Sequence, residues 1–388
     1  MRLNARIAVT MMFFVHGSNF GNWVARIPDI KAALNLSEGE LGQVLLGTPV
    51  GILIGLPLVS GFIVRFGSRR MAIFTMILFA MMMPLLGWMP SAVALFIALV
   101  LFGLVSSMND VSINSQGVAV EKLHQRSIMS SFHAAFSIGG FVGALMSAMF
   151  TSIGLDTQEH LFAAALILIS IGLVAAPNLI EVESERQTQR RSPFTLPTRA
   201  LWGLGLIAFF SSIGEGAMAD WSGVFMRDEV KVSDTLVPFG FAAFSFMMTF
   251  GRLSGDYLIE QFSPRFLVSM SGILAGIGLA LLVVWPTLPI SLLGFAMVGM
   301  GLSYVIPLMF AIAGQMPNLP AGAGIAGVAT LGYSGFLAGP PIIGLLAEAT
   351  SLRVSFILLS CSIATLIFWS YSVRNYSARR IILANAAD

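Results

Sequence analysis

Twelve apolar stretches, each long enough to cross a bilayer, constrain the fold of this chain more than any other feature. A transmembrane helix takes about 20 mostly apolar residues. Only 10% of the 388 residues are charged and 56% are hydrophobic, whereas charged residues make up about 25% of a soluble domain. The sequence therefore predicts an all-α integral membrane protein and excludes a soluble globular domain. The expected spans lie at about 6–26, 41–63, 71–89, 91–119, 127–151, 160–180, 200–225, 237–259, 265–285, 288–315, 321–347 and 352–373.

The longest polar segment, EVESERQTQRRSPFTLPTR, divides these spans into two groups of six. We expect an N-terminal six-helix bundle at 1–180, a cytoplasmic linker at 181–199, and a C-terminal six-helix bundle at 200–388 with a short cytoplasmic tail. The halves resemble each other at an offset of 198 residues, which aligns Asn22-Trp23 with Asp220-Trp221. Two pseudo-symmetric bundles are typical of secondary transporters, whose substrate site lies at the midplane between the halves.

The positive charges predict the orientation. If both termini are cytoplasmic, 16 of the 21 Lys and Arg residues fall on the cytoplasmic side and 5 on the other. Cytoplasmic loops carry such an excess of Lys and Arg. We therefore expect a multi-pass membrane protein with both termini in the cytoplasm.

Several functions lack the residues that they need. The single cysteine, Cys361, can form neither an intrachain disulfide nor a metal cluster, so no metal site and no cofactor is expected. A net charge of +2 without a basic stripe argues against nucleic-acid binding. An enzyme would need a nucleophile beside a base or a metal set, whereas the four His residues are scattered along the chain. A sensor or scaffold would need a large soluble domain. The expected partners are a small-molecule substrate, protons and the lipid bilayer, with the chain as a monomer.

Six placed motifs resemble those of the major facilitator superfamily and, more narrowly, its bacterial MosC/YbjJ-like subgroup. The resemblance covers the whole chain and implies alternating access, with spans one, four, seven and ten lining the cavity. It also implies a location in a bacterial inner membrane, but no particular substrate. The motifs are GNWVARIPDIKAAL, NDVSINSQGVAVE, FHAAFSIGG, EGAMADWSGVFM, FGRLSGD and GYSGFLAGPPIIGLLAE.

Three acidic residues fall within the expected spans: Asp110, Glu215 and Asp220. An ionisable group at the centre of a bilayer costs at least about 2.5 to 3.5 kcal/mol, so it usually faces a wet cavity or a partner. Asp110, with His133 at an axially compatible depth in the next span, is expected to carry protons, as is Glu215. Asp110 and His133 could instead only hold two helices together by hydrogen bonding.

A polar stripe in the first span predicts substrate contacts, because His16, Asn19 and Trp23 recur at helical spacing with Asn22 beside them. Amides and imidazole can satisfy several hydroxyls, while Trp offers a flat apolar face to a ring. This favours a sugar- or polyol-like solute, although Trp23 could also be an interfacial belt residue. The same role is expected of Asn114, Glu215, Tyr304 and Tyr333.

A gating latch is expected at the cytoplasmic ends of the second and eighth spans. Members of the superfamily usually carry an Asp before the basic residues of the loop between spans two and three, where this chain has Val64. Asp256, in the equivalent place after the eighth span, could take over the latch together with Arg252, four residues earlier on the same helical face. Asp220 is expected to cap the opposite rim by pairing with Arg26 or Arg227. The basic latch residues of the first half are Arg65, Arg69 and Arg70. They could equally be plain cytoplasmic anchors.

Taken together, the residues favour a proton-coupled symporter for a small polar solute. The alternative is a proton-driven efflux antiporter for drugs or metabolites. Antiporters of the superfamily often carry a Gly-Pro motif in span five, whereas this span has Gly139, Gly140 and Gly143 without proline, which favours uptake. Pairs of glycines four residues apart predict close helix contacts, and Pro340-Pro341 predicts a break in span eleven.

Overall fold

The computed structural model describes residues 4–125, 128–181, 201–316, 321–373 and 376, and these form an all-helical bundle. The first half contains α1 (Ala5–Ala33), α2 (Glu38–Leu45), α3 (Gly47–Phe66), α4 (Ser68–Gly87), α5 (Ala92–His124), α6 (Met129–Ser152), α7 (Thr157–Ala175) and the 3-10 turn η1 (Ala176–Asn178). The second half contains α8 (Trp202–Asp228), α9 (Phe239–Gln261), α10 (Pro264–Val284), α11 (Leu288–Leu302), α12 (Val305–Gly314), α13 (Ala321–Ala349), α14 (Leu352–Ala364), α15 (Leu366–Trp369) and the 3-10 turn η4 (Ser370–Val373).

Ten helical stretches of the described residues are long and apolar enough to cross a membrane. The remaining two predicted spans correspond to α1 and α9, which have 29 and 23 residues but a more polar composition. In α1 this polarity comes from residues such as His16 and Asn19, and in α9 from residues such as Ser245 and Arg252. The two helices of lower hydropathy, α1 and α9, are therefore helices whose polar side chains face the interior of the bundle.

Three expected spans are divided in the structure, and one expected break is absent. Span two is formed by α2 and α3 with a turn at Leu46, span ten by α11 and α12, and span twelve by α14 and α15. The break predicted at Pro340-Pro341 is wrong, because α13 runs through both prolines. Proline removes one backbone hydrogen bond, and in α13 this loss does not end the helix.

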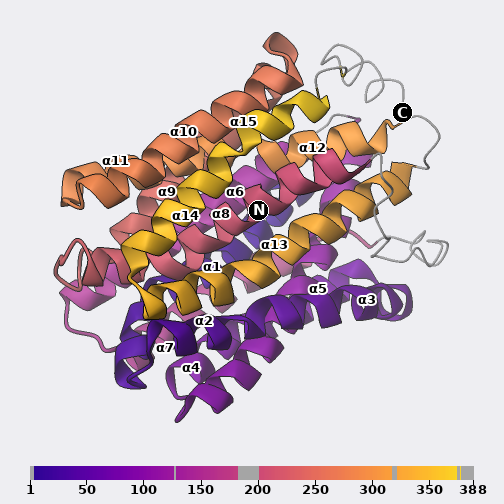
Figure 1. Cartoon of the computed structure of the whole chain (residues 1–388). Helices are drawn as coiled ribbons and strands as arrows, with labels where there is room; N and C mark the ends of the chain where they lie inside the picture. The colour runs from indigo at the N-terminus through magenta and orange to yellow at the C-terminus, as the bar shows by residue number, and fades with distance from the viewer. Residues whose placement is uncertain (1–3, 126–127, 182–200, 317–320, 374–375, 377–388) are drawn as a thin grey trace.

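The two halves pack in equivalent ways. In the first half α1 packs on α6 and α3 on α5, and in the second half α8 packs on α13 and α9 on α11. The halves meet through α1 with α8, α2 with α13, and α6 with α9. In Figure 1, α3, α4, α5 and α7 lie on one side of the molecule, and α10, α11, α14 and α15 on the other.

Small residues allow the closest helix contacts. Gly51 of α3 lies against the backbone of Val100 in α5, and Gly139 of α6 lies against the backbone of Phe14 in α1. A Cβ at either glycine would overlap a carbonyl oxygen of the facing helix. The helix contacts predicted from the glycine pairs are confirmed at these positions.

We call the end of the bundle that contains loops 34–37, 229–238 and 350–351 the closed end, and the opposite end, where α1 begins, the terminal end. At the closed end Gly223 of α8 packs against Pro28 of α1. Lys31 of α1 pairs with Asp228 of α8 at 3.0 Å, and Arg227 of α8 pairs with Asp29 of α1. Ion pairs and helix packing therefore join the two halves at this end.

Candidate functional site

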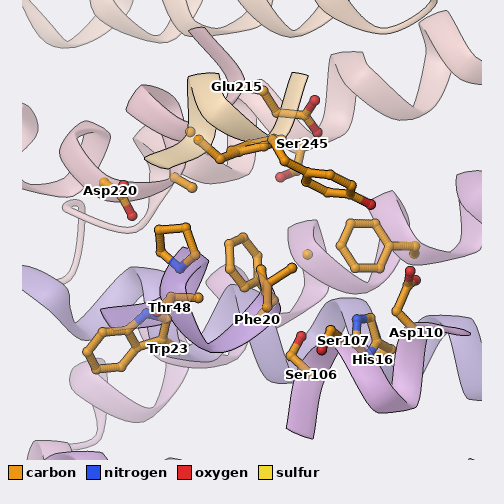
Figure 2. Close-up of a pocket in the computed structure, with 18 of the residues that line it drawn as sticks. His16, Phe20, Trp23, Thr48, Ser106, Ser107, Asp110, Glu215, Asp220 and Ser245 are labelled. Atoms are coloured by element: carbon orange, nitrogen blue, oxygen red, sulfur yellow. The ribbon is translucent and has the colours of Figure 1, made fainter. Parts of the chain in front are cut away.

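A central cavity of about 310 Å³ lies between the two halves. Figure 2 shows one wall built by the first half, with Asp110 and His16 near one end and Trp23 near the other. The facing wall belongs to the second half and carries Glu215 and Asp220. The other polar and aromatic residues that line the cavity come from both halves and include Phe20, Thr48, Ser106, Ser107, Phe136, Ser137, Phe241, Ser245, Arg252, Tyr333 and Phe336.

A second cavity of about 470 Å³ lies beside the first, toward the terminal end. Met129 and His133 contribute to it from the start of α6, and Pro307 and Phe310 contribute from α12. Four side chains line both cavities: Glu215, Arg252, Tyr333 and Phe336. We call these four residues the partition.

His16 is held in one orientation by a buried amide. Its Nδ1 lies 2.8 Å from Oδ1 of Asn109, whose Nδ2 donates to Thr75 Oγ1 and to the carbonyl of Ala72. Because that amide oxygen can only accept, the Nδ1 of His16 carries the proton. In the neutral form of this ring, Nε2 is the nitrogen that can accept a hydrogen bond, and His16 lines the cavity wall.

Asp110 lies on the cavity wall beside an amide. The Nδ2 of Asn114 donates to Oδ1 of Asp110 at 3.0 Å and to its carbonyl oxygen at 2.8 Å. Asp110 is close enough to His16, His133 and Tyr333 to interact with them electrostatically. The ring of His133 lines the second cavity and packs edge-on against Phe13, with the ring centroids 5.4 Å apart.

Glu215 forms an ion pair within the site. Its Oε1 lies 3.2 Å from a terminal nitrogen of Arg252, and the other terminal nitrogen of Arg252 donates to Ser137 Oγ at 2.7 Å. Arg252 thus lines both cavities and reaches the first half through Ser137. Its expected role in a latch between the halves stays a prediction.

Asp220 also lies on the wall of the central cavity. Its expected pairing with Arg26 or Arg227 is wrong, because both arginines pair with Asp29 instead. Arg227 additionally pairs with Asp234 at 3.0 Å. Within the part of the chain that the structure describes, no cation lies within 4 Å of the Asp220 carboxylate.

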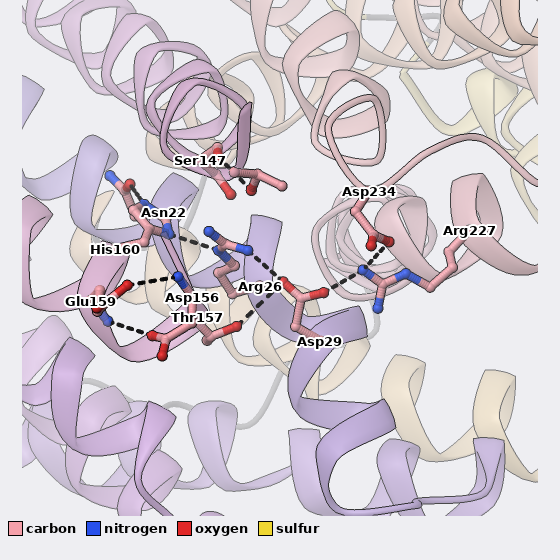
Figure 3. A network of polar contacts seen from close by, with 11 residues as sticks. Asn22, Arg26, Asp29, Ser147, Asp156, Thr157, Glu159, His160, Arg227 and Asp234 are labelled. Atoms are coloured by element: carbon pink, nitrogen blue, oxygen red, sulfur yellow. Dashed lines mark hydrogen bonds and ion pairs between the residues drawn. The ribbon is translucent and has the colours of Figure 1, made fainter. Parts of the chain in front are cut away.

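The expected stripe of the first span divides between two places. His16 and Trp23 line the central cavity, whereas Asn19 and Asn22 are buried outside its wall. Asn19 donates to the carbonyl of Val15 at 3.1 Å. Asn22 accepts at 2.7 Å from Nε2 of His160 (Figure 3). The polar stripe covers a wider part of the helix surface than the cavity wall does. Helical spacing alone therefore could not distinguish His16 and Trp23, which line the cavity, from Asn19 and Asn22, which do not.

The predicted residues of the second half line a cavity wall. Tyr333 of α13 lies in the partition, and Tyr304 lines the second cavity while its hydroxyl donates to the carbonyl of Leu267 at 3.4 Å. Asn114, which belongs to the first half, contacts the site through Asp110.

The basic residues predicted as a latch lie at the terminal end. Arg69 pairs with Glu181 at 2.8 Å, Arg65 lies 5.2 Å from the ring centroid of Phe66, and Arg70 is exposed. These contacts stay within the first half and its connecting segment. The side chain of Asp256 lies outside the described residues, as does 182–199 of the expected linker.

Sequence reasoning missed three polar residues that bind and orient the ionisable side chains of the structure. Asn109 orients His16, Ser137 binds Arg252, and His160 accepts at 2.8 Å from Nε of Arg26. Asn109 and Ser137 look like ordinary polar residues of a span, and only the packing of one helix on another reveals their partners. Asp29 follows Arg26 by three residues, and this i,i+3 spacing in the sequence could have indicated their ion pair.

A family model described as the Major Facilitator Superfamily matches residues 8–330. The chain belongs to this superfamily. It is therefore a multi-pass membrane protein and a secondary transporter of a small-molecule substrate, not an enzyme, as the sequence predicted. An uncharacterized MFS-type transporter of Yersinia pestis is 32% identical over 355 residues, which cover 91% of this chain and 92% of that protein. Membrane protein MosC of Rhizobium meliloti is 32% identical over 349 residues, covering 89% and 84%, so the resemblance to MosC is confirmed.

Solved structures confirm the fold. The chain superimposes on the nucleoside transporter NupG with a TM-score of 0.72 over 96% of this chain and 100% of that chain, at 13% identity. A bacterial homologue of the human lysosomal transporter Spinster, in an inward-facing and occupied conformation, matches with a TM-score of 0.68 over 98% and 96%, at 14% identity. The predicted major facilitator fold is therefore confirmed.

Proposed function

We propose that this transporter moves a sugar- or polyol-like solute by alternating access, in symport with protons. The observation that carries the proposal is the lining of the central cavity, in which hydrogen-bonding groups of both halves alternate with aromatic rings. Its volume of about 310 Å³ lies at the lower end of the range of small-molecule sites, roughly 300 to 1,000 Å³. A solute bound between the halves contacts both of them and so responds to their relative movement.

The hydrogen-bonding groups suit several hydroxyls. The carboxylate of Asp110 and, in its neutral form, the Nε2 of His16 can accept hydrogen bonds, and the hydroxyls of Ser106 and Ser245 both donate and accept. The ring of Trp23 supplies an apolar face against which the carbon skeleton of a sugar can pack.

Proton coupling is proposed for Asp110, with His133 and Glu215 as its partners in the cycle. Glu215 is paired with Arg252, whereas the contact of Asp110 is the uncharged amide of Asn114. A carboxylate without a paired cation is the one whose charge changes most readily when its access to water changes. Of the two carboxylates proposed to carry protons, Asp110 is therefore the first candidate to take up and release the proton.

Efflux of amphipathic compounds is the second candidate function. It is favoured by the number of aromatic rings on the cavity wall, among them Phe136, Phe241, Phe244 and Phe336. Such a wall accommodates large apolar surfaces as well as sugar rings.

We place both termini and the 181–199 linker in the cytoplasm, and we propose that 1–180 and 200–388 move as the two units of a monomer.

A panel of ligands tests the proposed solute class. Purified protein is heated with single hexoses, pentoses, polyols, amino acids and amphipathic cations, because a ligand that binds only the folded form raises the melting temperature by mass action. We expect at least one sugar or polyol to raise it, and the same compound to enter proteoliposomes faster with an inward proton gradient. Stabilisation by amphipathic cations alone, with their accumulation in inverted vesicles, would establish the efflux alternative.

A further inference from the structure

The partition between the two cavities contains one cationic side chain. Arg252 is the only Lys or Arg on the wall of either cavity within the described residues. Its side chain is 17% exposed, and its two terminal nitrogens contact Glu215 and Ser137. A charged group at this depth remains stable only while it keeps polar partners, so these two contacts hold the guanidinium between the cavities.

The contacts of Arg252 cross from one half of the protein to the other. The partition belongs entirely to the second half, since Arg252 lies on α9, Glu215 on α8, and Tyr333 and Phe336 on α13. Ser137 lies on α6 of the first half. A hydrogen bond is lost when donor and acceptor move beyond about 3.5 Å. A small displacement between the halves is therefore enough to free Arg252 from Ser137, which it now contacts at 2.7 Å.

We propose that Arg252 is an internal gate of the solute pathway, which closes the central cavity toward the second cavity while it is bound to both Ser137 and Glu215. Loss of the Ser137 contact lets the guanidinium turn toward Glu215 alone and joins the two cavities. The proposal rests on the proposed function in one respect, which is that the central cavity is the solute site. In this role Arg252 does not bind the solute, and its contacts with Ser137 and Glu215 hold its guanidinium between the two cavities.

Cysteine labelling measures this gate without any solute. In a Cys361→Ser background, Ser106→Cys reports on the central cavity and Ile259→Cys on the second cavity, since each residue lines only one of them. Both are reacted with a small hydrophilic methanethiosulfonate in detergent. We expect Arg252→Ala to raise the reaction rate at position 106 by about 10- to 100-fold, which is the shift in open population that loss of a charge-assisted hydrogen bond produces. The rate at position 259 should change less than about twofold.

Two further variants make the test specific. Ser137→Ala removes the contact between the halves but keeps the Arg252–Glu215 pair, so it should raise the rate at position 106 by a smaller factor, and it serves if Arg252→Ala does not fold. Arg265→Ala is the matched control, because Arg265 stacks on Tyr371 at 4.0 Å away from both cavities, and it should leave both rates unchanged. An unchanged rate at position 106 in both gate variants, or an equal rise at positions 106 and 259, would overturn the proposal. Since labelling needs neither solute nor gradient, failure of every sugar and polyol in the ligand panel would leave the gate result standing.

Discussion

Asp110 and Glu215 are both carboxylates of the central cavity, but their neighbours differ in charge. Glu215 has a cation beside it, so its charge is compensated within the protein. The neighbour of Asp110 is the amide of Asn114, which can donate a hydrogen bond but cannot compensate charge. The presence of these residues in the spans is readable from the sequence. Their different partners are not, because Arg252 reaches Glu215 from another helix.

Asp110→Asn separates proton coupling from binding. The amide keeps the shape of the carboxylate but remains neutral, so we expect exchange of a stabilising sugar or polyol across proteoliposomes to survive while accumulation driven by a pH gradient disappears. Counterflow and pH-driven uptake measure the two activities. Glu260→Gln is the control, since Glu260 is exposed on α9 outside both cavities, and it should leave both activities intact.

The opposite result would assign Asp110 a structural role. If the residue only stabilises α5 through its hydrogen bond with Asn114, the Asn variant should lose about 0.2 to 0.5 kcal/mol of stability, as such pairs at i,i+4 contribute. Gradient-driven uptake per folded molecule would then remain normal, and Glu215 would become the candidate for coupling.

At the scale of the helices, sequence reasoning predicted most of the spans and misplaced their interruptions. Length and hydropathy reveal where a helix can cross a bilayer, since each span must satisfy its backbone hydrogen bonds internally. They do not reveal a break such as the one at Ser303 and Tyr304, nor the continuity of α13 through Pro340 and Pro341. Those features depend on neighbouring helices, which can support or distort a turn that the local sequence leaves undecided.

The glycines of α3 provide a matched pair for testing helix packing. A methyl group at Gly51 would overlap the carbonyl oxygen of Val100, while nothing lies within 4 Å of a methyl group at Gly61. We expect Gly51→Ala to lower the free energy of unfolding by about 1 to 3 kcal/mol, the usual cost of overpacking. Gly61→Ala should leave it unchanged or raise it slightly, because alanine favours the helix. Melting of purified protein, followed by fluorescence-detected size exclusion, compares the two, and equal loss in both variants would contradict a close α3–α5 contact.

At the scale of the whole molecule, the closed end is braced by a network that runs through both halves (Figure 3). His160 of α7 accepts a hydrogen bond from Arg26, Arg26 pairs with Asp29 at 2.8 Å, and Asp29 pairs in turn with Arg227 of α8. Because the Nδ1 of His160 accepts, its proton lies on Nε2, which donates to Asn22. The buried imidazole thus holds Arg26, which in turn holds the carboxylate that reaches the second half.

Opening this end is the movement that an alternating-access cycle requires, and the ion pairs between the halves oppose it. Asp29→Asn combined with Lys31→Met removes the charges of the first half from both pairs, Asp29–Arg227 and Lys31–Asp228. Partly exposed ion pairs contribute up to about 1 kcal/mol each. We therefore expect the open population to rise by a factor of about 5 to 30, the change that 1 to 2 kcal/mol produces.

A cysteine on the cavity wall measures this opening and the orientation together. Thr48→Cys, in the Cys361→Ser background, is reacted with a membrane-impermeant thiol reagent in right-side-out and in inverted vesicles, since Thr48 lines the central cavity. With both termini cytoplasmic, the double variant should increase the reaction only in right-side-out vesicles. Asp234→Asn is the control, because Asp234 pairs with Arg227 within the second half, and it should change little. An increase confined to inverted vesicles would reverse the orientation inferred from the positive charges. An unchanged rate in both preparations would mean that helix packing, and not the ion pairs, keeps the closed end shut.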